Sequence, residues 1–456
     1  MNNSIVMISD EHNPLYSSVY GHPYIRTPNM ERLRDQGTVY RHAYCPSPLC
    51  SPSRSAFMSG KRVHELQNYS NCNLGIPSDA PTYGDVLREQ GVYTAYFGKT
   101  DVYAPGEQLG FSEMHYSKDR PVPGDAHFGR RPLSIRKGAA QRADGYGVKQ
   151  DAFNNDLKVM DAALRWLDEV SPTIQSRWCL TINLVNPHFP QWNTSPYWDL
   201  YPQAADLPAW GRDEESARHE YARDLRGHFE TDLFTEEQIR GLRRGYAGNV
   251  AFVDDQLGRL LDKMEAQGLL NTTQIIYTSD HGEMLGKFGM WWKCSLYEDS
   301  VRIPCLAAGP GYAKAAEVTT PVDLHDVQAS LFHAAQVPRP ASWVGEPLQT
   351  IAAQDEDRVI FSEYHGHGTR SGAYMIRKGA WKLIYYMEAP HQLFHLSEDP
   401  DERRNVYEAH PDKAQELEEE LRRICSPERE NERAHEFQKN QLESLSELQN
   451  PYREDG

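Results

Sequence analysis

The strongest constraint on the fold is a pair of short apolar runs, far apart in the chain, that both end in side chains able to bind a metal. The runs are residues 5–8, followed by Asp10 and Glu11, and residues 274–278, followed by Asp280 and His281. Apolar runs of this length are typical of buried strands. In open α/β sheets, functional groups lie just past the carboxyl ends of the strands. The pattern therefore predicts an α/β fold in which one sheet brings the two ends together.

The side chains at these two ends are ligands that divalent cations accept. Carboxylate oxygens and an imidazole nitrogen on neighbouring strands read as two halves of one cation site. For Asp10 taken alone, capping of the following segment is an equally good interpretation. The second strand end, with Asp280 and His281, favours the metal site.

Two further strand ends carry basic groups. Residues 92–97 form an apolar run followed by Lys99 and Asp101, and residues 178–185 form another followed by His188. A lone lysine after a strand is usually solvated, and a single loop histidine is more often incidental. His188 lies in a rigid turn with two prolines, which favours a functional role.

A compact motif, Cys-Ser-Pro-Ser-Arg, occupies residues 50–54 and is continued by Phe-Met-Ser-Gly-Lys at residues 57–61. Most free cysteines are small buried hydrophobes, which is the alternative interpretation of Cys50. Arg54 would be costly to bury without a partner, so an anion close to it is implied.

These motifs resemble the sulfatase family, nearest its choline-sulfatase and phosphonate monoester hydrolase branch. The resemblance runs from Asp10 to about Asn405, and it includes Met-Leu-Gly at residues 284–286 and Trp-Trp-Lys at residues 291–293. It implies an alkaline-phosphatase-like α/β fold, with a large mixed sheet sandwiched by helices. A smaller C-terminal α+β subdomain, made of an antiparallel sheet plus a helix, is expected beside it.

The resemblance also implies a site. A separate formylglycine-generating or sulfatase-maturating enzyme would oxidise Cys50 to formylglycine. Metal ligands would be Asp10, Glu11, Cys50, Asp280 and His281, around Ca²⁺ or alternatively Mg²⁺ or Mn²⁺. Catalytic residues would be Cys50, Arg54, Lys99, His188 and Lys293, and substrate-binding residues would be Lys99, Asp101, His188 and Lys293. Two positions depart from the family: many sulfatases have Asp at position 11 and His at position 101.

The chain is predicted to divide into three parts. Residues 1–345 would form the catalytic domain, and residues 346–410, with short strands after Arg358, would form the antiparallel-sheet subdomain. Residues 411–456 read as a charged helical tail, either a solvated face or an oligomer contact. The second reading predicts a homo-oligomer.

The charge of the chain excludes some classes of binding partner. A net charge of −17 and a pI near 5.5 argue against nucleic acid and anionic membranes. An anionic substrate would therefore need a local basic pocket. No apolar run is long enough to cross a bilayer, and no secretion signal is visible. With seven scattered cysteines, a reduced, cytoplasmic setting is expected.

The predicted function is hydrolysis of a sulfate monoester, on a small molecule or a sugar, to an alcohol and inorganic sulfate. One alternative keeps the site but cleaves a phosphonate monoester or phosphodiester. Another is an unmodified anion-binding homologue without turnover. Trp291 and Trp292 either pack in the core or form an aromatic wall against a cationic leaving group.

Overall fold

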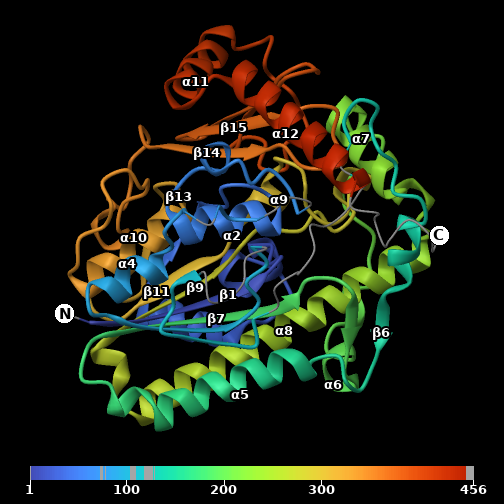
Figure 1. The fold of residues 1–456 in the computed structure, drawn as a ribbon. Helices are drawn as coiled ribbons and strands as arrows, with labels where there is room; N and C mark the ends of the chain where they lie inside the picture. Colours follow the sequence, from blue (N-terminus) through green and yellow to red (C-terminus); the bar gives the residue numbers. More distant parts are fainter. Residues whose placement is uncertain are drawn as a thin grey trace.

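The computed structural model describes residues 2–71, 75–77, 79–102, 109–117, 127 and 129–447. A large mixed sheet crosses its centre (Figure 1), with strand order β12-β2-β11-β9-β1-β7-β4-β5. The strands are β1 (Asn3–Asp10), β2 (Gly37–Tyr40), β4 (Tyr93–Gly98), β5 (Glu113–His115), β7 (Trp178–Pro187), β9 (Thr273–Ser279), β11 (Cys305–Ala308) and β12 (Ala316–Val318). Strands β9, β1, β7, β4 and β5 run parallel, whereas β11 is antiparallel to both of its neighbours.

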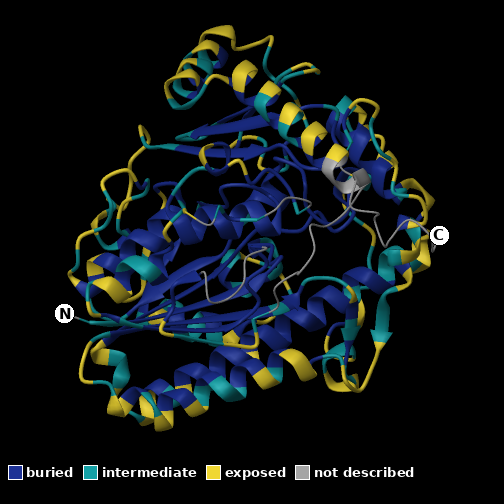
Figure 2. Ribbon diagram, viewed as in Figure 1, coloured by how far each residue is buried: buried dark blue, intermediate teal, exposed yellow. Residues whose placement is uncertain are grey.

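Helices cover both faces of this sheet. Successive side chains of a strand point to opposite faces, so Ile5 and Met7 of β1 join one core and Val6 and Ile8 join the other. The first core is closed by α1 (Pro28–Gln36), α5 (Asn154–Glu169) and α8 (Glu236–Ala266), and the second by α2 (Cys50–Ser59), α4 (Tyr83–Glu89) and α10 (Leu324–Ala335). Figure 2 shows the strands buried and the outer sides of α5 and α11 exposed.

The parallel strands β1, β9, β7 and β4 all end at the same edge of the sheet, and these ends carry the polar residues singled out in the sequence. Asp10 is the last residue of β1, and Asp280 and His281 follow β9 directly. Lys99 follows β4, and His188 follows β7. The predicted convergence of strand ends on one place is therefore present.

A second, antiparallel sheet follows in the chain, with order β14-β15-β16-β17. Its strands are β14 (Val359–Tyr364), β15 (Ala373–Lys378), β16 (Trp381–Tyr386) and β17 (Gln392–His395). One face packs on the main core through Met375 and Ile384. The other face packs on Leu417 and Leu421 of α11 (Pro411–Ile424). The predicted fold class, a large mixed sheet with a smaller antiparallel sheet and helix, is confirmed.

A buried ionic network around Glu298 joins the C-terminal sheet to α9 (Glu298–Val301) and β3 (Ala43–Tyr44) of the preceding part of the chain. Its carboxylate accepts a hydrogen bond from Tyr44 Oη at 2.9 Å and from Lys382 Nζ at 3.0 Å. Lys382 lies 2.7 Å from Glu402 Oε1 as well, and Arg377 donates to the Tyr44 hydroxyl. Tyr44 and Glu298 come from the catalytic part, whereas the other three come from the C-terminal sheet and its following loop.

The charged tail is not uniformly solvated. Helix α12 (Pro427–Glu447) buries Asn431 and Gln438. Asn431 Oδ1 accepts a hydrogen bond from the Gly372 amide at 2.7 Å, and Gln438 donates to the His365 carbonyl at 2.9 Å. Residues 448–456 of the predicted tail lie outside the described residues. The predicted domain boundaries and the oligomer contact stay predictions.

The remaining elements are short or lie around the rim. They are β3 (Ala43–Tyr44), β6 (Tyr146–Val148), β8 (Gln191–Asn193), β10 (Arg302–Ile303), β13 (Val322–Asp323), α3 (Val63–Leu66), α6 (Ser195–Trp198), α7 (Glu220–Phe229) and α9 (Glu298–Val301), with 3₁₀ turns between them. Within the described residues, no helix has the length and apolar character needed to cross a membrane. Cys72 lies outside the described residues, and the other six cysteines are free.

Candidate active site

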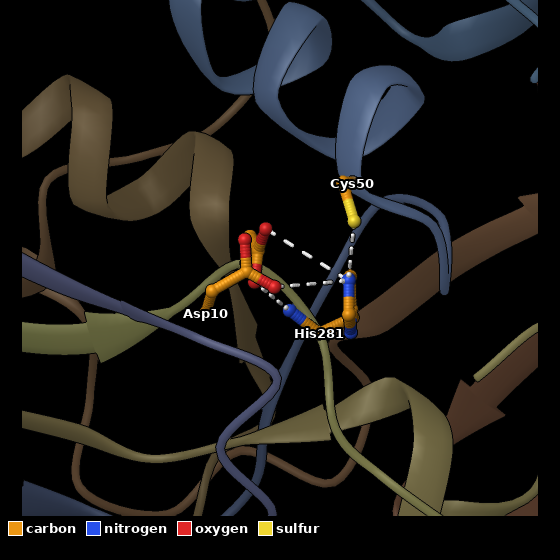
Figure 3. A group of neighbouring side chains, drawn as sticks. Asp10, Cys50 and His281 are labelled. Atoms are coloured by element: carbon orange, nitrogen blue, oxygen red, sulfur yellow. Dashed lines mark hydrogen bonds and ion pairs between the residues drawn. The ribbon is translucent and has the colours of Figure 1, made fainter. Parts of the chain in front are cut away.

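Cys50 is the first residue of α2 and lies beside the ends of β1 and β9. Its Sγ atom is 3.2 Å from His281 Nε2. That nitrogen in turn lies 3.8 Å from Asp10 Oδ1 and 3.8 Å from Asp280 Oδ2. All four side chains are buried, and Figure 3 shows Asp10, Cys50 and His281 pointing toward one another. Elements more than two hundred residues apart thus form one compact cluster.

Two oxygens of this cluster are unsatisfied. Asp10 Oδ1 and Glu11 Oε1 are buried, and neither has a hydrogen-bond partner among the described residues. Buried carboxylate oxygens are costly without a donor or a cation. One ligand atom each from Asp10, Cys50, Asp280 and His281 lies within 4.8 Å of the others, and the same holds for Asp10, Glu11 and His188. The donor set therefore fits a hard divalent cation.

His281 supports the same conclusion. Its Nδ1 donates to the Gly282 carbonyl at 3.0 Å, which leaves Nε2 facing the cluster. Burial alone would lower the pKa of His281, but the charges of Asp280 and Cys50 outweigh it and raise the pKa to about 9. The surrounding negative charge thus favours a positive charge here, either a proton on the imidazole or a metal ion in its place.

Arg54 and Lys99 form the inner basic wall. Arg54 Nε lies 2.8 Å from Asp280 Oδ2, and its two terminal nitrogens bond Asp10 Oδ2 at 3.0 Å and Asn183 Oδ1 at 2.9 Å. Lys99 Nζ lies 2.5 Å from Asp10 Oδ2. Burial would raise the pKa of Asp10, but the charges of Lys99 and Arg54 hold it well below its ordinary value. Asp10 is therefore an anion. The anion that the sequence implied near Arg54 is this pair of aspartates.

Lys293 and His188 form the outer wall, with Glu11 between them. Lys293 Nζ lies 2.6 Å from His188 Nε2 and 3.2 Å from Glu11 Oε2. His188 Nδ1 donates to the Phe189 carbonyl at 2.6 Å. Burial, together with the Lys293 charge, lowers the pKa of His188 well below its ordinary value. A neutral imidazole with its hydrogen on Nδ1 presents a lone pair at Nε2, so the ammonium group donates and His188 accepts.

Asp101, predicted to bind substrate, lies 3.2 Å from Lys99 Nζ. Two further residues were missed in the sequence. Asn183 of β7 accepts from Arg54, and Glu283 accepts from the Leu285 and Trp292 amides at 2.9 and 2.7 Å. Burial, followed by the repulsive charge of Glu283, raises the pKa of Glu11 well above its ordinary value despite Lys293. The sequence feature that could have indicated a role for Glu283 is its position, three residues after the predicted ligand Asp280.

Several non-glycine residues in the loops around the site adopt a left-handed backbone conformation. Glu11, Asp101, Trp292 and Cys294 have φ values of 66°, 53°, 68° and 77°. Such conformations are uncommon for residues other than glycine, and they persist only where the surrounding contacts enforce them. They concentrate here on residues at or next to predicted site positions.

Trp291 and Trp292 are 3% and 2% exposed, and their ring centroids lie 6.1 Å apart. Trp292 packs on Phe189, and Trp291 packs on Phe234. Core packing accounts for both indoles, and neither presents an open face to a cationic leaving group.

Comparison with known proteins identifies the relatives of this chain. Residues 2–337 match the family model described as sulfatase, and residues 286–430 match the model of the C-terminal part of N-sulphoglucosamine sulphohydrolase. The chain is 30% identical to arylsulfatase K of Danio rerio, over 96% of this chain and 87% of the relative. It is 31% identical to choline-sulfatase of Rhizobium meliloti, over 84% of this chain and 78% of the relative.

Two solved structures share the fold. A phosphonate monoester hydrolase from Silicibacter pomeroyi superposes with a TM-score of 0.75 at 21% identity, covering 93% of this chain and 95% of that one. A protein solved in complex with its substrate, D-glucosamine-2-N,6-O-disulfate, superposes with a TM-score of 0.73 at 20% identity, covering both chains completely.

Proposed function

The chain belongs to the sulfatase family and is a sulfuric ester hydrolase, and on this premise we propose that it cleaves a sulfate monoester through formylglycine made from Cys50. The observation that carries the proposal is the position of Cys50 Sγ, 3.2 Å from His281 Nε2 and grouped with Asp10 and Asp280. The sulfur in this structure stands in for the hydroxyl oxygens that the hydrated aldehyde would place there in the working enzyme. A thiol that is merely packed in a core has no reason to face a metal-ligand set.

Two groups supply chemistry that the unmodified chain lacks. The hydrate offers two hydroxyls on one carbon, one to attack sulfur and the other to release the sulfate afterwards. A divalent cation would be held by Asp10, Glu11, Asp280 and His281 and would provide Lewis-acid stabilisation of negative charge. We propose Ca²⁺ because carboxylate oxygens dominate this ligand set; Mg²⁺ and Mn²⁺ are the alternatives.

The side chains around Cys50 have separate tasks. Arg54 pairs with Asp10 and Asp280, which stabilises the negative charge of both carboxylates and fixes their orientation at the inner end of the site. Lys99 and Lys293 neutralise charge on the non-bridging sulfate oxygens. Lys293 also gives a proton to the departing alcohol, because His188 Nε2 carries a lone pair and accepts from it. His188 is thus a positioning residue for the lysine.

The substrate class that we propose is a sulfated sugar. The structural neighbour solved with a disulfated glucosamine and the basic lining of Lys99, Lys293 and Arg54 support this choice. A homo-oligomer and a cytoplasmic location stay predictions.

The test is the mass of the tryptic peptide from His42 to Arg54, taken from protein made in its own host. Conversion to formylglycine lowers the peptide mass by about 18 Da relative to the thiol form. This peptide also contains Cys45, a buried cysteine of the core, so fragmentation must place the loss on residue 50. A thiol at both positions in active protein would remove the proposed nucleophile.

Parallel assays on matched sulfate and phosphonate esters separate the remaining alternative. We expect the sulfate ester to be the better substrate by kcat/KM. Preference for the phosphonate would reassign the reaction at the same site. Absence of turnover on either, with an unmodified thiol at Cys50, would indicate an anion-binding homologue.

A further inference from the structure

Arg142 is a cation close to the site that pairs with no acidic side chain in the described part of the chain. It lies in the 3₁₀ segment Ala139–Asp144, with its Cζ 5.4 Å from the centroid of the Phe189 ring and 5.9 Å from that of Phe229. Within the described residues, the guanidinium makes no ion pair and no hydrogen bond. Partial burial lowers the pKa of Arg142. A guanidinium that is partly desolvated beside two aromatic rings is a suitable site for an anion.

The Phe189 ring links Arg142 to the outer wall of the active site. The imidazole of His188 stacks on this ring at 4.2 Å, and Lys293 Nζ lies 4.9 Å from its centroid. Arg142 and Lys293 therefore flank one phenylalanine. The Arg142 charge also interacts with that of Glu11. An anion bound at Arg142 would therefore lie close to Phe189, the ring beside Lys293, which is the proposed proton donor to the leaving alcohol.

No acidic side chain among the described residues neutralises this region by pairing with Arg142. Arg136 adds a second guanidinium, with its Cζ 5.9 Å from the Phe229 ring centroid. His367 and His228 lie beside it, and burial together with these cations lowers the pKa of both imidazoles, that of His228 to about 4. The chain as a whole has a net charge of −17. The positive charge gathered beside the site therefore contrasts with the rest of the protein and favours an anionic ligand there.

We propose that Arg142 binds a second anionic group of the substrate, a carboxylate or another sulfate, carried on the alcohol that leaves. The inference rests on the proposed function, and it narrows the sulfated sugar to one with at least two negative charges. It also argues against a cationic leaving group, which would face the positive charges of Arg142, Arg136 and Lys293.

The test compares three matched sugar sulfates: one with no other charge, one with a carboxylate in place of the hydroxymethyl group, and one with a second sulfate. Charge-assisted contacts of this kind give about 10- to 100-fold in kcat/KM. We expect the enzyme to prefer one dianionic ester over the singly charged sugar sulfate by this factor. The better of the two identifies the second anion as carboxylate or sulfate.

Arg142→Gln should reduce the preference to about two-fold or less, and Arg142→Lys should retain part of it. Arg244→Gln is the matched control. Arg244 also lies over an aromatic ring, with its Cζ 4.4 Å from the Trp198 centroid, but it bonds the Trp198 carbonyl and lies 3.3 Å from Asp199. This control should leave the preference unchanged.

The same three esters should be titrated by calorimetry into Cys50→Ala protein, with and without Arg142→Gln. Binding preference that depends on Arg142 supports the inference even if turnover fails, in which case only the proposed function is refuted. Equal binding and equal turnover of all three esters, unaffected by the Arg142 variants, would overturn the inference and leave the sulfatase function in place.

Discussion

Replacement of Lys293 by Met should impair the hydrolysis of esters with poor leaving groups far more than that of activated esters. The reason is geometric. Lys293 Nζ donates to the lone pair of His188 Nε2 at 2.6 Å and is held on its other side by Glu11 Oε2 at 3.2 Å. Burial alone would lower the pKa of Lys293, but nearby negative charge, including that of Glu11, raises it above the ordinary lysine value. The ammonium is thus protonated and aimed when the alcohol departs.

The magnitude follows from two separable roles. General acid catalysis contributes about 10²- to 10⁴-fold in rate, and an alkyl alcohol needs all of it. A nitrophenolate leaves without a proton, so only charge neutralisation at the sulfate is lost, about 10²- to 10³-fold or about 2.7–4 kcal/mol. Both kinds of ester lose the charge neutralisation, which cancels, so the ratio of the two losses should be about 10²- to 10⁴-fold.

The assay is kcat/KM for a series of sulfate esters that differ in the pKa of the leaving alcohol, measured on both proteins. Lys287→Met is the matched control. Lys287 lies six residues earlier, is also buried, and pairs with Asp299 at 2.6 Å. Loss of this buried pair should destabilise the fold by about 3–5 kcal/mol without changing the dependence on the leaving group.

Equal losses across the series in Lys293→Met would refute the assignment of the proton to Lys293. If the loss in kcat/KM grew with the pKa of the leaving alcohol in His188→Ala but not in Lys293→Met, the proton donor would be His188 instead.

Three further predictions concern the metal, an ion pair and the tail. Removal of divalent cations by a chelator should lower the melting temperature, since a ligand at 100 times its Kd stabilises by about 2.7 kcal/mol, and Ca²⁺ should restore it; an unchanged melting temperature would contradict a resident cation. Buried Glu363 lies 2.8 Å from His64 Nδ1 and 2.8 Å from His365 Nε2; burial would raise its pKa, but His64 outweighs this and holds it below the ordinary value of 4.5. The stabilisation by this ion pair should therefore be present above about pH 4.5 and be lost as the pH falls below it. In a plot of the urea unfolding midpoint against pH, Glu363→Gln should make the fall at acid pH less steep. An unchanged fall would refute the assignment. Leu417→Ala should cost about 2–5 kcal/mol, because its side chain is fully buried against the C-terminal sheet; a loss below 0.5 kcal/mol in urea unfolding would show that α11 is not packed there.

The placement of the site was predictable because it depends on periodicity alone. Apolar runs before Asp10 and Asp280 indicate strands, and parallel strands present their carboxyl ends at one edge. Once Lys99 and His188 also follow strands, their convergence is a consequence of topology. The structure adds only the order of the strands.

The orientation of the side chains could not be predicted in this way. Which nitrogen of His188 faces Lys293 depends on the turn that carries it. The left-handed backbone of Glu11 and Trp292 depends on contacts with distant loops. Arg142 follows no strand and belongs to no motif, so only the structure shows its guanidinium over the Phe189 ring, on which His188 stacks. The burial of the tail could not be predicted either. In a charged helix the sequence does not distinguish an exposed polar side chain from a buried, hydrogen-bonded one such as Asn431.

The network around Glu298 limits how this architecture can be recombined. A crossover that replaced only the C-terminal sheet would bring in a new residue at position 382 while retaining Glu298 and Tyr44 from the original chain. A mismatch would leave a buried carboxylate or ammonium without its counterpart. Viable chimeras should therefore exchange residues 44, 298, 377, 382 and 402 as one inherited set, although they are scattered over most of the chain.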